Sequence, residues 1–203
     1  MAFETYVYMV ASAPSPSRAV AAILNRVYPL GSRMEGEFYE IGGGMRQTVP
    51  EEPGWAAKVD SWQGVHFAIV KTGPLIGISL HQLSGTTLRA CVDVSGKLLS
   101  HLFVNGRQHD PIFYVPLFQI ALALGARTGV GDLELDEFKP VSEKEIEQGI
   151  RNSPQESGTP SRLGFLRKDP GTPQPAGDFV VTERPEGYWL LEHPSFRSFL
   201  GEK

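Results

Sequence analysis

Four apolar segments separated by short turns follow one another between Gly64 and Val104, and they constrain the fold more than any other part of the chain. The segments are residues 65–71, 75–83, 86–94 and 98–104. Short turns such as Ser84-Gly85 join antiparallel neighbours, because a parallel connection needs a crossover of about a dozen residues or more. The pattern therefore predicts an antiparallel β-meander.

The third segment indicates how the two faces of this sheet differ. In this segment the apolar side chains of Leu88, Ala90, Val92 and Val94 alternate with those of Thr87, Arg89, Cys91 and Asp93. Successive side chains of a strand point to opposite faces, so one face is buried and the other is partly wet. Arg89 and Asp93 are therefore candidate binding residues on the wet face.

Two longer helices are predicted to pack on the sheet. After Pro16, apolar side chains recur at i, i+3, i+4 and i+7, the spacing that places them on one side of a helix. They are Val20, Ile23, Leu24 and Val27. Residues 116–124 are nearly all apolar and end at Gly125, which is typical of a buried helix closed by a C-terminal glycine.

The remaining elements complete the expected architecture. Further strands are predicted over residues 5–11, 37–41 and 133–138. Ser142 and Glu145 form a capping-box pattern, which opens a short polar helix. The predicted fold class is α+β, an antiparallel sheet of about six or seven strands with helices packed on one face, plus a small C-terminal β-hairpin/helix unit.

Composition divides the chain near residue 152. Residues 152–178 contain five prolines and four glycines, which is typical of a linker or flexible loop. We predict a main α+β domain over residues 1–151 and a small C-terminal unit over 179–203. Because so small a unit is unstable alone, it should dock on the main domain or on a partner through its aromatic side chains. Tyr188 and Trp189 are the candidate binding residues there.

Charge and cysteine content narrow the classes of function. The net charge is −4, so no overall positive field draws the protein to nucleic acid or to anionic lipid. No stretch approaches the roughly 20 apolar residues that span a bilayer. We predict neither nucleic-acid nor membrane binding. Cys91 is the one cysteine and cannot form an intramolecular disulfide, which is typical of a reducing compartment, so we expect a cytoplasmic protein.

Cys91 and the histidines are the residues that could carry catalysis. Cys91 lies in mid-strand, whereas reactive cysteines favour helix N-termini and electropositive sites. His66, His81 and His101 lie on three strands of the meander and could hold a metal ion if the register brought them together. Ordinary sheet positions are the simpler interpretation of all four. The sequence therefore predicts no catalytic residue, no metal site and no cofactor.

Two other regions are candidate binding surfaces. Trp55 and Trp62 flank an irregular segment, where tryptophans either form an interface or close over the core. Glu134 and Asp136 alternate along the strand predicted over 133–138 and make an acidic edge. Such an edge is either a solvated face that prevents sheet aggregation or a surface for a basic partner.

The leading hypothesis is a non-enzymatic cytosolic protein-interaction module with a protein partner. A bacterial adaptor, or an immunity-type inhibitor that binds and blocks a toxin or enzyme, fits the acidic surface and the aromatic C-terminal unit. One alternative is a hydrolase or transferase that uses Cys91 or the strand-borne histidines. Another is a small-molecule binding domain with its pocket between the sheet and the helices. The sequence leaves the oligomeric state open.

Overall fold

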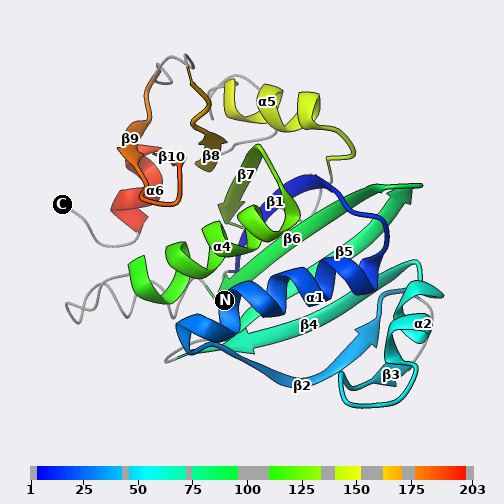
Figure 1. Cartoon of the computed structure of the whole chain (residues 1–203). Helices are drawn as coiled ribbons and strands as arrows, with labels where there is room; N and C mark the ends of the chain where they lie inside the picture. Colours follow the sequence, from blue (N-terminus) through cyan, green and yellow to red (C-terminus); the bar gives the residue numbers. More distant parts are fainter. Residues whose placement is uncertain are drawn as a thin grey trace.

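The fold is built on one open antiparallel sheet of ten strands (Figure 1). The computed structural model describes residues 4–42, 46–71, 75–95, 110–133, 140–151, 162–170 and 177–199. The strand order is β3-β2-β4-β5-β6-β1-β7-β8-β10-β9. This confirms the α+β class and the antiparallel sheet. The expected six or seven strands were too few, because the sheet continues through the C-terminal part of the chain.

The meander forms as the turn lengths indicated. Strands β4 (Gly64–Val70), β5 (Ile76–Ser84) and β6 (Thr87–Ser95) pair in sequence as antiparallel neighbours. The segment predicted over residues 98–104 lies outside the described residues. On the other side of β4, β2 (Arg33–Glu40) and the two-residue β3 (Gln47–Thr48) complete this end of the sheet.

The first strand of the chain lies in the middle of the sheet. Strand β1 (Glu4–Ser12) pairs with β6 on one side and with β7 (Thr128–Leu133) on the other. The predicted strand over 133–138 overlaps β7 only at its last residue, and residues 134–138 lie outside the described part of the chain.

The C-terminal residues extend the same sheet. The predicted hairpin is present as β9 (Val180–Glu183) and β10 (Tyr188–Glu192), followed by α6 (Pro194–Phe199). Strand β8 (Leu163–Arg167) lies inside the segment predicted as a linker and pairs with both β7 and β10. The hairpin therefore joins the main sheet through β8. The division into residues 1–151, 152–178 and 179–203 stays a prediction.

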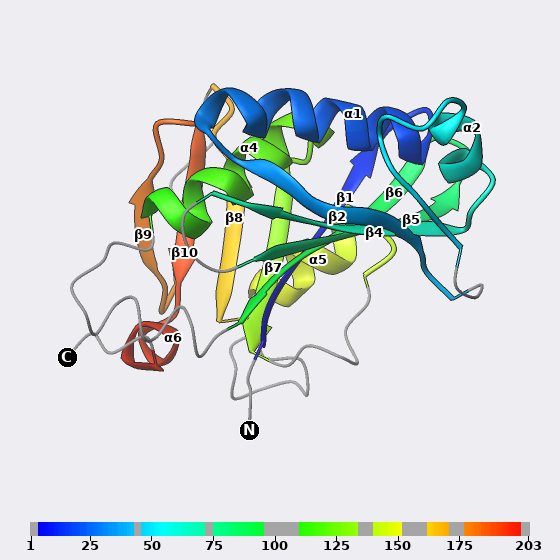
Figure 2. The same ribbon diagram turned by 90° about the horizontal axis from the view of Figure 1, so that it is seen from below.

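One face of the sheet, here called the helix-covered face, lies under α1 (Pro16–Val27), α2 (Trp55–Asp60) and α4 (Val115–Leu124) (Figure 2). The predicted stripe of α1 is buried, with Val20 and Ile23 fully inaccessible. The 3-10 turn η1 (Tyr28–Leu30) follows α1, and the π-helical turn η2 (Asp110–Tyr114) leads directly into α4. Pro116 lies in the first turn of α4, where its missing N–H costs nothing.

The opposite face, here called the second face, carries one helix. Helix α5 (Glu143–Arg151) lies under β7 and β1, on the side of the sheet away from α1 and α4 (Figure 2). The capping box is confirmed, because the Glu145 N–H donates to Ser142 Oγ at 3.3 Å and the Ser142 N–H donates to Glu145 Oε2 at 3.1 Å. The expectation of helices on one face only was wrong, because α5 has a mainly polar sequence and buries Ile146 against the other face of the sheet. No helix in the described residues is long and apolar enough to cross a membrane.

Candidate functional site

The second face of the sheet divides into an apolar part and a polar part. Around α5, the buried side chains Tyr8, Val10, Val130, Ile146 and Leu191 form a small apolar cluster. Toward β4, β5 and β6 the same face carries half-buried polar groups, here called the polar half-face. They are His66, Ser79, His81, Arg89 and Asp93. Among the described helices, none lies over this part of the sheet (Figure 2).

Two glycines on neighbouring strands make room for polar side chains of this face. Gly77 lies opposite Asp93, and a Cβ on Gly77 would come within 2.4 Å of Asp93 Oδ2. Gly64 lies opposite His81, and a Cβ there would come within 3.0 Å of His81 Nδ1. The carboxylate and the imidazole therefore lie across the glycines, close to the surface of the sheet.

Arg89 and Asp93 are opposite charges that cannot neutralise each other. They lie four residues apart on one face of β6, which separates them by about 13 Å. Within the described part of the chain, neither side chain forms a hydrogen bond or an ion pair, and Arg89 Nε is buried without a partner. Burial raises the pKa of Asp93, the nearby His66 lowers it, and Glu4 raises it further. The two charged side chains are thus half-buried and have no ion-pair partner among the described residues.

A hydrogen bond joins two strands in the middle of the polar half-face. His66 Nδ1 and Ser79 Oγ are 3.0 Å apart on paired positions of β4 and β5. Nucleophilic catalysis by Ser79 would also need donors for an oxyanion. Ser79 is paired with β4 and with β6, so the backbone N–H groups around it are used by the sheet. The arrangement suits hydrogen bonding to a ligand better than it suits acyl transfer.

Cys91 lies between Arg89 and Asp93 and is 7% exposed. Burial, with a smaller contribution from Asp93, raises the pKa of its thiol to about 12, although Tyr8 and Arg89 act in the opposite direction. A thiol that stays protonated at neutral pH is a poor nucleophile. This environment disfavours the hydrolase or transferase hypothesis that uses Cys91.

The histidine cluster is only partly within the described structure. His66 and His81 lie on the same face, on adjacent strands, but they are displaced along the sheet because their partners in the register are Ser79 and Gly64. His101 lies outside the described residues, as does His109. In the ranges that the structure describes, no three histidine, cysteine, aspartate or glutamate side chains are grouped as metal ligands.

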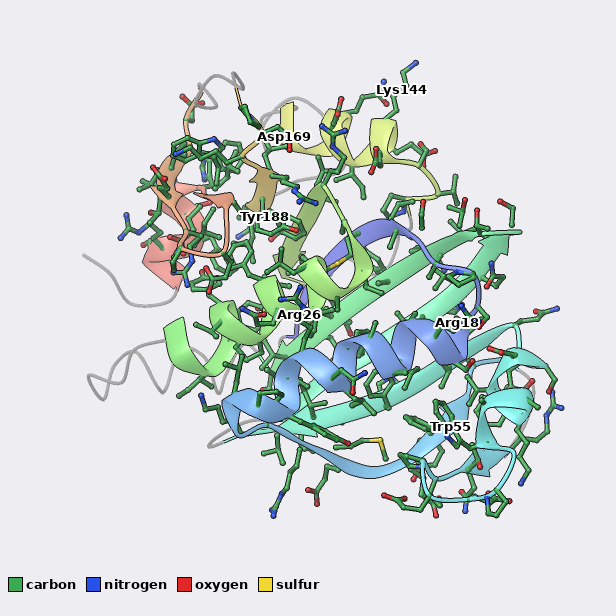
Figure 3. All side chains as sticks on the ribbon, in the orientation of Figure 1. Arg18, Arg26, Trp55, Lys144, Asp169 and Tyr188 are labelled. Carbon is green, nitrogen blue, oxygen red and sulfur yellow. The ribbon has the colours of Figure 1, made fainter. Side chains whose placement is uncertain are left out.

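The aromatic candidate residues mostly lie in the core. Trp55 packs its ring 5.3 Å from that of Phe38, and Trp62 is 5% exposed. Tyr188 is fully buried between the C-terminal hairpin and α4 (Figure 3), where its hydroxyl donates to the Ala126 carbonyl oxygen at 2.8 Å. Trp62 and Tyr188 therefore offer a partner little surface.

Trp189 is the aromatic candidate that belongs to the second face. It is half-buried, and Lys168 Nζ lies 4.9 Å from the centre of its ring. Its Nε1 is buried without a hydrogen-bond partner in the described residues. The acidic pair Glu134 and Asp136 lies outside those residues. Of the eight candidate binding residues, Arg89 and Asp93 are the two that the structure places on the polar half-face.

Sequence reasoning did not assign His66 and Ser79 to the binding surface. The signal was present in the alternation of β4 and β5, because Gly64, His66 and Ala68, and likewise Gly77, Ser79 and His81, occupy every second position. These small or polar residues share one face, like Arg89 and Asp93 on β6. What the sequence lacked was the register that aligns the three strands. Tyr39 of β2, opposite His66 and 46% exposed, adds an aromatic border.

Comparisons with known proteins give distant structural likenesses. No protein-family model matches the chain, and no curated protein matches it. One similar solved structure is the Pseudomonas aeruginosa T6SS protein PA0821, with 12% identity and a TM-score of 0.41, over 98% of this chain and 74% of that one. Another is a chain from the crystal structure of the toxic C-terminal tip of CdiA from Pseudomonas aeruginosa in complex with an immune protein. It has 13% identity and a TM-score of 0.38, over 72% of this chain and 92% of that one.

Proposed function

We propose that the protein is a non-enzymatic protein-binding module that engages its partner through the polar half-face. The observation that carries the proposal is the pair Arg89 and Asp93, two half-buried opposite charges that form no ion pair or side-chain hydrogen bond with the described residues. A partly buried charge that lacks a partner destabilises the fold. A binding protein with a carboxylate opposite Arg89 and a cation opposite Asp93 would supply both interactions.

The shape and spacing of the surface favour a protein over a small molecule. The two charges are about 13 Å apart on a regular sheet, a separation that two side chains of one protein surface can match. The small side chains between them, at Gly77 and Ser79, leave the sheet open to a close approach. The exposed ring of Tyr39 supplies the kind of aromatic contact that is enriched at interfaces.

The finer form of the proposal is an adaptor or an immunity-type inhibitor that binds and blocks a toxin or enzyme. The protonated thiol of Cys91 and the absence of free backbone donors around Ser79 support binding without chemistry. We place the protein in the cytoplasm because its one cysteine is a buried free thiol, as expected in a reducing compartment.

Charge reversal tests the surface. We expect Arg89→Glu and Asp93→Lys each to reduce capture of the partner from a cell lysate by tenfold or more, since an interfacial charge pair becomes a repulsion. Arg18→Glu is the matched control, because Arg18 is exposed on α1, on the opposite side of the sheet (Figure 3). If both reversals capture the same protein as strongly as the control does, the polar half-face is not the interface.

The C-terminal unit needs a different test from truncation. Removal of residues 153–203 would delete β8 and β10, with the buried side chains of Phe165 and Tyr188, and would unfold the sheet. Trp189→Phe instead keeps an aromatic ring in place and removes the indole N–H together with the five-membered ring that carries it. Reduced capture by the folded variant would extend the binding surface to Trp189, and unchanged capture would confine it to the polar half-face.

A further inference from the structure

The two outer strands of the sheet are protected to different degrees. At one end, the outermost strand β3 covers β2 only at Phe38 and Tyr39, so the first half of β2 forms the edge. Strand β2 carries a bulge between Glu35 and Tyr39, and Gly36 there adopts a left-handed conformation with φ of 74°. Arg33 and Glu35 form an exposed ion pair on the same strand. Bulges and charges on an edge strand prevent another strand from pairing with it. This edge is closed to strand addition.

Strand β9, at the other end, has no bulge, and its one charged side chain, Glu183, is already ion-paired with Lys168 of the same chain. It consists of Val-Val-Thr-Glu and pairs with β10 through four consecutive residues without a bulge. Three of the four residues are β-branched, and Val180 is 36% exposed. In the described residues, no backbone group of β9 forms a hydrogen bond on the side away from β10. A regular edge of this composition is a template for a further strand.

The hairpin geometry identifies which backbone groups of β9 point outward. The Arg184 N–H donates to the Tyr188 carbonyl oxygen at 2.8 Å, and Gly187, with φ of 86°, closes the turn. Hydrogen-bonded and non-hydrogen-bonded pairs alternate along an antiparallel ladder. Val180 and Thr182 therefore bond to β10, while the N–H and C=O groups of Val181 and Glu183 face away from it.

We propose that β9 pairs with β9 of a second copy of this chain, antiparallel and about a two-fold axis at Val181. In this register Val181 lies opposite Val181 of the other copy, and Val180 lies opposite Thr182. Glu183 lies opposite Phe179, so no two like charges face each other. A two-fold contact of this kind is closed and uses the same surface on both copies. The edge of β9 is thus self-complementary, and the pairing covers the exposed side chain of Val180.

The dimer is weak and separate from the proposed binding function. A pair of four-residue strands buries far less surface than the roughly 1,600 Å² of a standard interface. Monomer and dimer therefore exchange, and the fraction of dimer rises with protein concentration. In the strand order, β9 is at the far end of the sheet from β4 and β5. Failure of the dimer therefore leaves the polar half-face proposal untouched, and the reverse also holds.

Sedimentation velocity over a wide concentration series of the full chain tests the pairing. We expect the wild type to shift toward a dimer as concentration rises. Val181→Pro removes an outward N–H but no bond to β10, and Val180→Lys places a charge on the edge; each should weaken self-association by at least about tenfold. Val141→Lys is the matched control, because Val141 is 52% exposed near the start of α5 and should leave the dimer intact.

Thermal melting by circular dichroism establishes that each variant is folded. If Val181→Pro does not fold, Val180→Lys decides the result alone. A wild type that stays monomeric across the series would overturn the proposal. The proposal would also be overturned if the folded β9 variants dimerised as strongly as the Val141→Lys control.

Discussion

The two faces of this sheet are covered by helices to different extents. On the helix-covered face, aromatic and aliphatic side chains such as Phe38, Phe67 and Phe118 are fully buried under α1, α2 and α4. On the second face, α5 covers the part around Ile146, and β6 keeps Arg89 and Asp93 half-buried without an ion-pair partner in the part of the chain that the structure describes. We conclude that stability is concentrated on the first face, whereas the second face retains groups that suit recognition better than packing.

The largest expected effect is Phe118→Ala on the helix-covered face. The Phe118 ring is fully buried, stacks 5.3 Å from Tyr188 and meets Phe165 edge-on at 5.7 Å. Loss of such a ring leaves a cavity and should lower the free energy of unfolding by about 3–5 kcal/mol in guanidinium titrations. Tyr39→Ala on the second face, where the ring is 46% exposed, should cost under about 1 kcal/mol. Equal losses would erase the contrast between the faces.

A glycine on each face gives a second comparison. A Cβ at Gly129 would come within 2.1 Å of Phe165 Cε1, in a ring held by the core, while one at Gly77 would meet the Asp93 carboxylate at 2.4 Å. The ring cannot move without repacking, but the carboxylate can turn toward solvent. We expect Gly129→Ala to cost about 2–3 kcal/mol and Gly77→Ala about 1 kcal/mol or less in urea unfolding.

The double variant Gly77→Ala with Asp93→Ser provides the control for this comparison. Because serine leaves room for the new methyl group, the cost of Gly77→Ala should fall in the Asp93→Ser background. An undiminished cost would mean that the substitution strains the backbone of β5 and does not collide with the carboxylate.

A smaller effect is expected from Cys91 at alkaline pH. Burial raises the pKa of its thiol from 9.0 to about 12, so the folded state keeps a proton that the unfolded state loses. The stability due to this proton is complete below pH 9 and is lost as the pH rises from 9 toward 12. At pH 10 the wild type should therefore lose about 1.4 kcal/mol relative to Cys91→Ala, compared with pH 7.

Comparison with Cys91→Ala isolates the thiol from the buried tyrosines. Burial also raises the pKa of Tyr188, to about 12, and that of Tyr114, and both titrate alike in the two proteins. If the stability difference between wild type and Cys91→Ala is the same at pH 7 and pH 10, the thiol is not protected from ionisation.

The elements that sequence reasoning identified are those with local signals. The pairing of neighbouring strands in the meander, the apolar stripe of α1 and the Ser142/Glu145 capping box each depend on residues that are close in the sequence, and all three are present. Strand β8 was missed because Leu163–Arg167 lies in a Pro/Gly-rich stretch and is stabilised by β7 and β10, which are distant in sequence. Local composition carries no information about such pairing.

The binding surface shows the same limit. Alternation in β6 was enough to place Arg89 and Asp93 on the wetter face, because the period of a strand is local. The burial of Trp62 and Tyr188 depends on tertiary packing. Their residue types alone therefore could not show whether they lie in the core or at an interface. The role of Gly77 depends on its register with Asp93, sixteen residues away in the chain.

The smallest expected effect is a gain of stability from Asp93→Asn. Since burial raises the pKa of Asp93 above its ordinary value of 3.8, its contribution to stability is complete below pH 3.8 and is lost as the pH rises through the folded-state pKa. At pH 7 the ionised carboxylate therefore lowers stability, and asparagine should raise the free energy of unfolding by up to about 1 kcal/mol. Asp169→Asn, which removes a partly exposed ion-pair partner of Arg127 and Arg167, should give no such gain in the same urea titration. The stabilised Asp93→Asn variant should also capture the partner less well, because a residue that costs stability on an otherwise well-packed sheet is expected where binding needs its charge. A less stable Asp93→Asn variant would instead make Asp93 a structural residue and remove half of the surface proposed for recognition.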